Sequence, residues 1–372
     1  MFFTKHIIIN HIIKKNVIKI IHALQMLFKS NKALNNNNRI GIIALHKLGD
    51  SIFTIPAIKQ IINHHKKNIF LVCFSETTSI FKIIFSSINF IELSHNDFFL
   101  SNRIAKHKTR KGLKKLNFST IYDLTGAINS ATLLLNNPAK DIIGINETYY
   151  KPIYTRFSKI RSEPHMTDIY LDAIKSVIPF KNFERITIKN NGVNKYIIIH
   201  PFASIESKEW GLNKYICLTE HLNKRYNCVI VTPTNKISAD VLSQIIKKKI
   251  KVVETKTTAE LIETIKQCSL LIGNDSGPVH IANLLGKPTF TIYGPTNPLF
   301  HKPLEGRNKY IIKEIPCSPK LTEKMCFTCA GRIGCPSFEC INKLSFKEVK
   351  DSVDEFIESL EKQNTKIVDI IE

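Results

Sequence analysis

The sequence has no run of 18 apolar residues, so it predicts no helix that spans a membrane. The glycine patterns GxGxxG and GxxxxGK[ST] are also missing, which argues against the usual dinucleotide site and against a Walker-type nucleotide site. No small-residue cleavage site follows the apolar N-terminal stretch, so we expect no signal peptide. Without such a signal, the nine cysteines predict reduced thiols in a cytoplasmic protein rather than a disulfide framework.

Arginine is scarce, because it occupies nine of the 53 basic positions and lysine supplies the rest. Acidic residues number 31, so the formal net charge is +22. A hydrophobic content of 43% is typical of a globular protein, and 372 residues suffice for two domains. The excess of lysine indicates either a solvated basic surface or affinity for an anion such as nucleic acid, phospholipid or a phosphorylated glycolipid.

Residues 1–34 form a basic, amphipathic segment. Its apolar residues recur at helical spacing, with lysines between or beside them: Ile13, Val17, Ile20, Leu24 and Leu27. Two interpretations of this predicted helix stay open. It lies on an anionic membrane surface, or it packs on the first domain.

Short apolar strands alternate with helical segments along the rest of the chain, in two series. The first covers residues 39–185 and starts with RIGIIAL, and the second covers residues 190–345 and starts with KYIIIHPF. Continuous apolar strands of this kind are typical of parallel sheets covered on both faces. We therefore expect an α/β protein with two doubly wound domains. A final helix is predicted within residues 346–372, where Ser345 and Glu348 fit a capping box.

The stretch GNDSGPVH stands between an apolar strand and a predicted helix. Asp275 or Ser276 can cap that helix, and Gly277 lets the backbone approach a ligand closely. Free N–H groups at the start of the helix favour a phosphate, and His280 lies about one turn further on. A well-capped helix and a phosphate site are both compatible with these residues alone.

Two more loops follow predicted strands. In HPFASIESKEW, Ser204 and Lys208 supply a hydroxyl and a cation suited to a diphosphate, unless they only decorate an exposed loop. Trp210, at the end of this stretch, is predicted to be a packing anchor. In LHKLGDSIFTIPAI, Asp50 can cap a helix or act as a general base. Ligands of open parallel sheets bind beyond the carboxyl ends of strands, so we expect these loops at a binding site.

Taken in order, the blocks KLGDSIFTIPAI, YDLTGAINSA, HPFASIESKEW, GNDSGPVHIANLLGKP and YGPT resemble glycosyltransferase family 9, the ADP-heptose:lipopolysaccharide heptosyltransferases. The resemblance covers about residues 39–345. It implies a GT-B fold, in which two Rossmann-like doubly wound domains face a central cleft and the C-terminal helix returns toward the first domain. It also favours the phosphate interpretation of GNDSGPVH, in which the same residues cap the helix and bind phosphate.

The resemblance further implies roles for individual residues. Asp50 matches the aspartate proposed as the catalytic base, which takes a proton from the acceptor hydroxyl in a single inverting displacement. The implied donor-binding residues are Ser204, Lys208, Asp275, Ser276, Gly277 and His280. Lys208 and the N–H groups around Ser276 and Gly277 would stabilise the leaving ADP. With no DxD motif near these segments, no metal is expected for catalysis.

The implied reaction moves heptose from ADP-heptose to the lipopolysaccharide core, lipid A-Kdo, at the cytoplasmic face of the bacterial inner membrane. The basic surface suits peripheral contact with that anionic membrane, and no nucleic-acid partner is expected. Three alternatives stay open: a protein O-heptosyltransferase of the autotransporter type, a family 9 enzyme with another nucleotide sugar, and, ranked lower, a non-catalytic protein that binds nucleic acid or membrane.

The sequence departs from the family pattern at two positions. Asn129 stands near the place where the family often has an arginine, and Asn235 stands where members tend to have a glutamate that helps to hold the ribose. Both departures bear on which acceptor and which donor are used.

A cysteine-rich segment, residues 317–340, contains the pair CFTC, which has metal-ligand spacing. The four cysteines that could hold a structural zinc or iron are Cys326, Cys329, Cys335 and Cys340. The alternative is that they remain reduced thiols. The resemblance extends to protein-modifying heptosyltransferases of the autotransporter type, which have iron-binding cysteines near the C-terminus.

Overall fold

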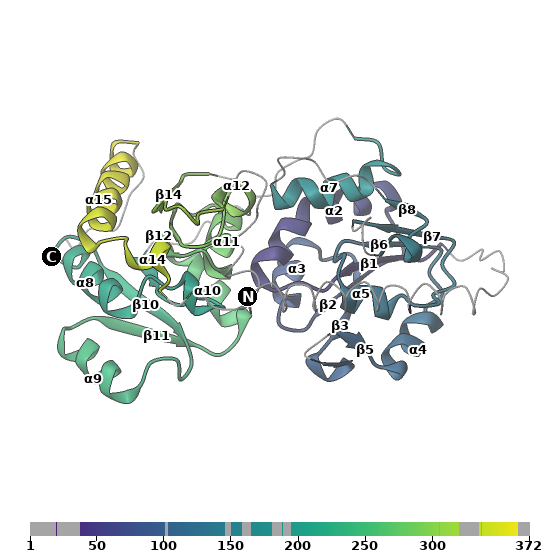
Figure 1. Cartoon of the computed structure of the whole chain (residues 1–372), viewed down its shortest axis with the longest axis horizontal. Helices are drawn as coiled ribbons and strands as arrows, with labels where there is room; N and C mark the ends of the chain where they lie inside the picture. Colours follow the sequence, from purple (N-terminus) through teal and green to yellow (C-terminus); the bar gives the residue numbers. More distant parts are fainter. Residues whose placement is uncertain are drawn as a thin grey trace. The chain divides into compact units, whose positions relative to one another are not determined.

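The computed structural model describes residues 38–100, 103–145, 150–157, 165–180, 195–304, 306–319 and 337–363, with the single residues 20, 188 and 335. These residues fall into two compact units, divided between residues 184 and 185. Figure 1 shows that each unit is built on its own sheet. The amphipathic segment 1–34 lies outside the described residues apart from Ile20, so both of its interpretations stay predictions. Within the described part, no helix combines the length and apolar character needed to cross a membrane.

The first unit contains a six-stranded sheet in which every neighbouring pair is parallel, in the order β3-β2-β1-β6-β7-β8. Its strands are β1 (Ile40–Ala44), β2 (Ile69–Phe74), β3 (Asn89–Leu93), β6 (Thr120–Asp123), β7 (Asp141–Gly144) and β8 (Arg156–Phe157). Its helices are α2 (Leu48–His65), α3 (Thr78–Ile84), α4 (His107–Lys115), α5 (Ile128–Leu133) and α7 (Met166–Lys175). A separate antiparallel hairpin joins β4 (Phe98–Phe99) to β5 (Ile104–Ala105).

The second unit contains another six-stranded parallel sheet, in the order β11-β10-β9-β12-β13-β14. Its strands are β9 (Tyr196–His200), β10 (Cys228–Pro233), β11 (Lys251–Thr255), β12 (Cys268–Asn274), β13 (Thr289–Tyr293) and β14 (Asn308–Ile312). Its helices are α8 (Leu212–Leu222), α9 (Ala239–Lys247), α10 (Thr258–Lys266), α11 (Gly277–Leu284), α12 (Pro298–His301), α14 (Glu339–Asn342) and α15 (Phe346–Lys362).

Both sheets have the strand order of a Rossmann fold. Numbered along the chain within each unit, the order is third, second, first, fourth, fifth and sixth. The central strands are continuous apolar runs, such as IGIIA of β1, in which every residue is buried because helices cover both faces. The prediction of two doubly wound α/β domains is therefore confirmed. The order reverses between β1 and β6 and between β9 and β12, which are the places where such sheets bind ligands.

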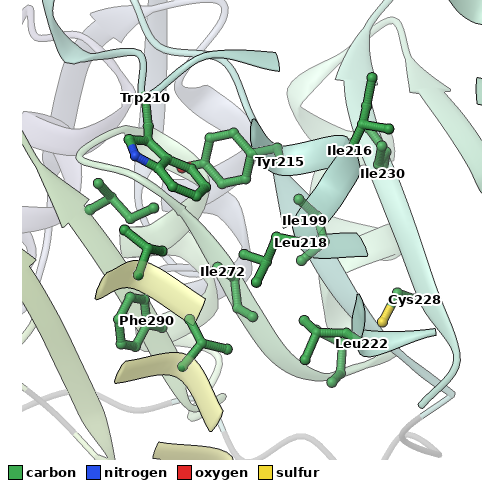
Figure 2. Packing of buried hydrophobic residues seen from close by; sticks show 14 of the residues in the cluster. Ile199, Trp210, Tyr215, Ile216, Leu218, Leu222, Cys228, Ile230, Ile272 and Phe290 are labelled. Atoms are coloured by element: carbon green, nitrogen blue, oxygen red, sulfur yellow. The ribbon is translucent and has the colours of Figure 1, made fainter. Parts of the chain in front are cut away.

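The core of the second unit is a cluster of aromatic and aliphatic side chains, shown in Figure 2 around Trp210, Tyr215 and Phe290. The C-terminal helix α15 adds its apolar face to this cluster, and its predicted capping box is confirmed by the Ser345 and Glu348 hydrogen bonds. The resemblance implied that this helix returns toward the first domain. In the structure its apolar face packs on α8 and β14 of the second unit, since burial there removes that face from water, and the return toward the first domain stays a prediction.

Candidate active site

A buried ion pair stands where β9 and β12 of the second unit end. Asp275 follows β12 directly, and Lys208 belongs to the 3-10 turn Glu206–Lys208 in the loop after β9. Lys208 Nζ donates to Asp275 Oδ2 at 2.5 Å. The two side chains are 18% and 3% exposed, so the contact is largely closed to water. The loops HPFASIESKEW and GNDSGPVH, 67 residues apart at this contact, thus come together at the switch point.

The Asp275 carboxylate also has His280 of α11 beside it, with His280 Nε2 at 3.7 Å from Asp275 Oδ1. Burial by itself raises the pKa of Asp275, but the Lys208 ammonium and the neighbouring His280 outweigh that effect and hold the pKa well below its usual range. Asp275 is therefore ionised at any ordinary pH. Its fixed negative charge positions the lysine and the histidine at the start of α11.

The N-terminus of α11 keeps its first-turn N–H groups without a side-chain cap. Ser276 holds the N-cap position, as the sequence predicted, but its hydroxyl donates to the carbonyl of Asn274 at 3.2 Å instead of capping the helix. Gly277 begins the helix and Pro278 lies in its first turn, which suits the missing N–H of proline. A helix start without a side-chain cap, next to a lysine, is suited to an anion.

Asn274 is a site residue whose role the sequence did not reveal. Its fully buried side-chain amide donates to the carbonyl of Pro201 at 2.7 Å. The amide oxygen accepts from the backbone N–H of Trp210 at 3.1 Å and from the Tyr215 hydroxyl at 2.8 Å. The amide therefore fixes both ends of the loop that holds Lys208. The stretch GNDSG places this asparagine at the end of a buried strand. A local sequence pattern cannot predict hydrogen-bond partners that lie about 60 to 70 residues away.

The loop between those ends holds the other two residues singled out in HPFASIESKEW. Ser204 is exposed and lies outside the buried Lys208–Asp275 contact. Trp210 is 1% exposed, and its indole N–H donates to the carbonyl of Leu344 at 2.9 Å, so its predicted role as a packing anchor is confirmed. Glu209 accepts from the Ala203 N–H at 2.9 Å and holds the turn between them.

Asp50 lies in the first turn of α2, directly after the switch-point strand β1. The helix-cap interpretation is wrong, because α2 begins at Leu48 and Lys47 occupies the N-cap position. Asp50 is half-buried near Tyr170 of α7: burial raises the pKa of that tyrosine, and the charge of Asp50 raises it further. His46 completes the cluster, with its ring centroid 5.2 Å from that of Tyr170 and Nε2 3.0 Å from the carbonyl of Leu124.

Asp123 is a second residue that the sequence did not single out, although it stands in the quoted block YDLTGAINSA. It is fully buried at the end of β6 and accepts from the Tyr154 hydroxyl at 2.9 Å, the Ser130 hydroxyl at 2.8 Å and the Thr125 N–H at 2.9 Å. Burial raises its pKa, although these hydrogen bonds oppose the shift. Asp123 shapes the loop before α5. Asn129, in the first turn of α5, accepts from the Ser130 N–H at 2.8 Å.

The second departure from the family pattern, Asn235, is exposed at the carboxyl edge of the second sheet. Its backbone is left-handed, with φ of 60°, and its N–H donates to Glu254 Oε1 of β11 at 3.2 Å. A carboxylate therefore does stand at this loop, but it comes from the neighbouring strand.

The cysteine cluster lies only partly inside the described residues. Cys335 is half-buried, Cys340 is buried in α14, and Cys326 and Cys329 lie outside the described residues. Among residues that the structure describes, no three histidine, cysteine or acidic side chains gather as metal ligands. Metal binding by the full set of four cysteines stays a prediction.

A family model described as glycosyltransferase family 9 (heptosyltransferase) matches residues 106–330, which is more than half of the chain. The chain belongs to glycosyltransferase family 9. This family 9 enzyme is 26% identical over 301 residues to lipooligosaccharide heptosyltransferase 2 of Campylobacter jejuni, an alignment that covers 75% of this chain and 88% of that protein.

Solved structures with the same fold include the ADP-heptose lipopolysaccharide heptosyltransferase II of E. coli. The TM-score is 0.65 at 15% identity, with 87% of this chain and 99% of that chain covered. The iron-containing dodecameric glycosyltransferase TibC of E. coli H10407 is also similar, with a TM-score of 0.57, 12% identity and coverage of 88% and 78%. At these identities the likeness shows the fold alone, and it confirms the predicted GT-B class of this family 9 glycosyltransferase.

We expect Lys208→Met to destabilise the second unit by about 3–5 kcal/mol, because it leaves the Asp275 carboxylate buried without its cation. Unfolding in urea, followed by the fluorescence of Trp210, the only tryptophan, measures the change. The double variant Lys208→Met, Asp275→Asn should recover about half of the loss or more, since no unpaired charge is left at the pair. A double variant as unstable as the single one would contradict this account.

His200 is the last residue of β9, directly before the loop that holds Lys208. Burial lowers its pKa to about 4, whereas the unfolded value is about 6.5. Between these values the unfolded chain binds a proton that the folded chain does not. The free energy of unfolding therefore falls as the pH drops from about 6.5 to about 4, by up to about 3 kcal/mol. His200→Gln should flatten that dependence in urea titrations, while the exposed His107→Gln should keep the slope of the unmodified protein.

Proposed function

We propose that this family 9 enzyme transfers heptose from ADP-heptose to the lipopolysaccharide inner core, with inversion at the anomeric carbon. The observation that carries the proposal is the Lys208–Asp275 pair beside the start of α11, because a cation and backbone N–H groups at a switch point suit a diphosphate. The C. jejuni and E. coli relatives, a lipooligosaccharide heptosyltransferase and an ADP-heptose lipopolysaccharide heptosyltransferase, support the sugar and the acceptor class.

The lysine of the pair can serve the donor while it is held by the aspartate. An ammonium group has three N–H donors, and Asp275 accepts from one of them. The others are available to phosphate oxygens, and the low exposure of Lys208 strengthens such contacts because little water screens them. Asp275 is then a positioning residue for the cation. His280, Ser276, Gly277 and the exposed Ser204 complete the proposed donor site.

In the proposed reaction the Asp50 carboxylate takes the proton of the acceptor hydroxyl as its oxygen attacks the anomeric carbon of heptose. The bond from that carbon to the diphosphate oxygen breaks, and its electron pair leaves with ADP. The leaving ADP gains negative charge, which Lys208 and the first-turn N–H groups of α11 stabilise. The proposed base, Asp50, and the groups that stabilise the leaving ADP all belong to this chain.

The proposed location is the cytoplasmic face of the inner membrane, where the core glycolipid is embedded among anionic lipids. The formal charge of +22 supports peripheral attraction to such a surface. A second candidate function is a protein O-heptosyltransferase. The fold shared with TibC and the pair CFTC in the cysteine-rich segment support it.

The decisive experiment is turnover by the purified full chain with ADP-heptose and lipid A-Kdo or a heptosylated core, read by mass spectrometry. We expect the glycolipid to gain the mass of one heptose. Donor binding without transfer to either glycolipid would favour a protein acceptor or another core sugar. A protein that does not bind ADP-heptose at all would refute the proposal.

The variant Asp50→Asn tests the base. We expect kcat to fall by about 10²–10⁴, because the amide cannot accept the proton, while the Kd of ADP-heptose stays unchanged. Asp240→Asn is the matched control, since Asp240 is also a first-turn aspartate, on α9, and should leave kcat as it is. Unchanged turnover of Asp50→Asn would remove Asp50 from the chemistry.

A further inference from the structure

The β4–β5 hairpin of the first unit exposes three large apolar side chains. Phe99 is 56%, Leu100 70% and Ile104 37% exposed, whereas the two partners on the inner side of the hairpin, Phe98 and Ala105, are buried. Phe99 and Ile104 pair directly across the two strands, so their side chains lie on one face. Elsewhere in the described residues, exposed large apolar side chains stand singly along the chain. A cluster of this kind marks an interaction surface.

Hydrogen bonds hold the described residues of this hairpin, 98–100 and 103–105, in a defined conformation. The Ala105 N–H donates to the hydroxyl of Thr132 on α5 at 3.0 Å, and that hydroxyl is shared between the carbonyls of Asn129 at 3.1 Å and Arg103 at 3.3 Å. The Arg103 N–H donates to the carbonyl of Phe99 at 3.0 Å, and the Lys106 N–H donates to the carbonyl of Asp97 at 2.9 Å. The apolar side chains are therefore presented by a fixed scaffold.

The residues around the hairpin are strongly basic. From Phe98 to Tyr122 the sequence contains seven lysines and arginines and no acidic residue. Helix α4 buries only Leu113 and exposes Lys108, Lys111 and Lys115. Across the described residues, no carboxylate forms an ion pair with the cations of α4. The exposed apolar face thus lies beside a surface of uncompensated positive charge.

Lys106 connects the apolar and the basic parts, because its Nζ lies 5.2 Å from the centroid of the Phe99 ring. Such a contact holds the ammonium next to the aromatic ring without removing its charge. Figure 1 shows β5 and α4 in the first unit, consecutive along the chain and both in contact with α5.

The hairpin and Asp50 belong to the same edge of the first sheet. The hairpin follows the carboxyl end of β3, and it is bonded to α5, which follows the carboxyl end of β6. Asp50 follows the carboxyl end of β1. Because all three strands are parallel, their carboxyl ends lie at one edge. A surface that binds at the hairpin therefore lies on the side of the unit that holds the proposed base.

We infer that the β4–β5 hairpin and α4 form a docking surface for an anionic phospholipid bilayer. Phe99, Leu100 and Ile104 enter the interface between headgroups and acyl chains, while the lysines of α4 bind headgroup phosphates. Charge alone would also suit a nucleic-acid duplex, but a duplex does not bury the exposed apolar face, whereas a bilayer buries that face and binds the lysines. Only the purpose of docking, access to an acceptor in that bilayer, rests on the proposed function; the docking surface itself does not.

The test is co-sedimentation of the full chain with vesicles that contain no acceptor. The vesicles consist of phosphatidylethanolamine with a minority of phosphatidylglycerol, or of phosphatidylcholine alone as the neutral comparison. We expect binding to the anionic vesicles only, weakened by salt. Two double variants test the surface. One combines Phe99→Ser with Leu100→Ser, and the other combines Lys108→Glu with Lys111→Glu. Each should lower the partition coefficient by about tenfold or more.

Two control variants make changes of the same kinds on the second unit. Ile246→Ser removes a singly exposed apolar side chain of α9, 60% exposed, and Lys247→Glu with Lys251→Glu reverses the same number of charges. Both should bind vesicles like the unmodified protein. Hairpin variants that bind equally well, or controls that lose binding to the same extent, would overturn the inference. So would equal binding to neutral vesicles, or salt-sensitive binding to a DNA duplex that displaces the vesicles.

Transfer to a detergent-dispersed acceptor separates this inference from the proposed function. Hairpin variants that lose vesicle binding but keep such transfer support the docking surface and show that the unit is folded. If no form of the protein transfers heptose, selective loss of vesicle binding in the hairpin variants still supports the docking surface, and only the proposed function fails.

Discussion

The amide of Asn274 binds three residues, Pro201, Trp210 and Tyr215, that precede it by about 60 to 70 residues, and the candidate site depends on these bonds. It stands at the end of a fully buried strand, where an amide without partners would cost about 1–3 kcal/mol. Its contacts to Pro201, Trp210 and Tyr215 satisfy it and at the same time fix both ends of the loop after β9. Lys208 stands within that loop, so the position of its ammonium follows from a buried hydrogen-bond network and not from the loop alone.

Beneath this network, Trp210 and Tyr215 belong to the largest side chains of the second core, and their rings meet edge to face with centroids 5.1 Å apart. The site therefore rests on fully buried aromatic side chains of the second core. This support matters because a buried ion pair contributes little to stability by itself. Lys208 and Asp275 are better explained by what they offer an anion than by what they add to the fold.

The two units have the same strand order but place different chemistry at their switch points. The second unit offers a cation and a helix N-terminus, which suit a leaving diphosphate. The first unit offers a half-buried carboxylate, Asp50, with His46 and Tyr170 nearby, and Asp123 shapes the adjacent loop. Its positive charge is concentrated instead in α4, beside the exposed hairpin. A general base works best without a cation holding its lone pairs, so this separation suits the proposed reaction.

Local patterns in the sequence determined the strands, their burial and the loops that carry chemistry, because a parallel strand covered on both faces must be a short apolar run and its ligand loops must follow it. They also determined the family, through ordered blocks such as GNDSGPVHIANLLGKP. Tertiary structure alone decided the roles of Asn274 and Asp123, since their partners come from other strands and loops, and it decided that Lys47, not Asp50, stands at the N-cap of α2. The basic segment before Phe118 shows why: without apolar periodicity, only its pairing and its contacts with α5 define which side chains face water.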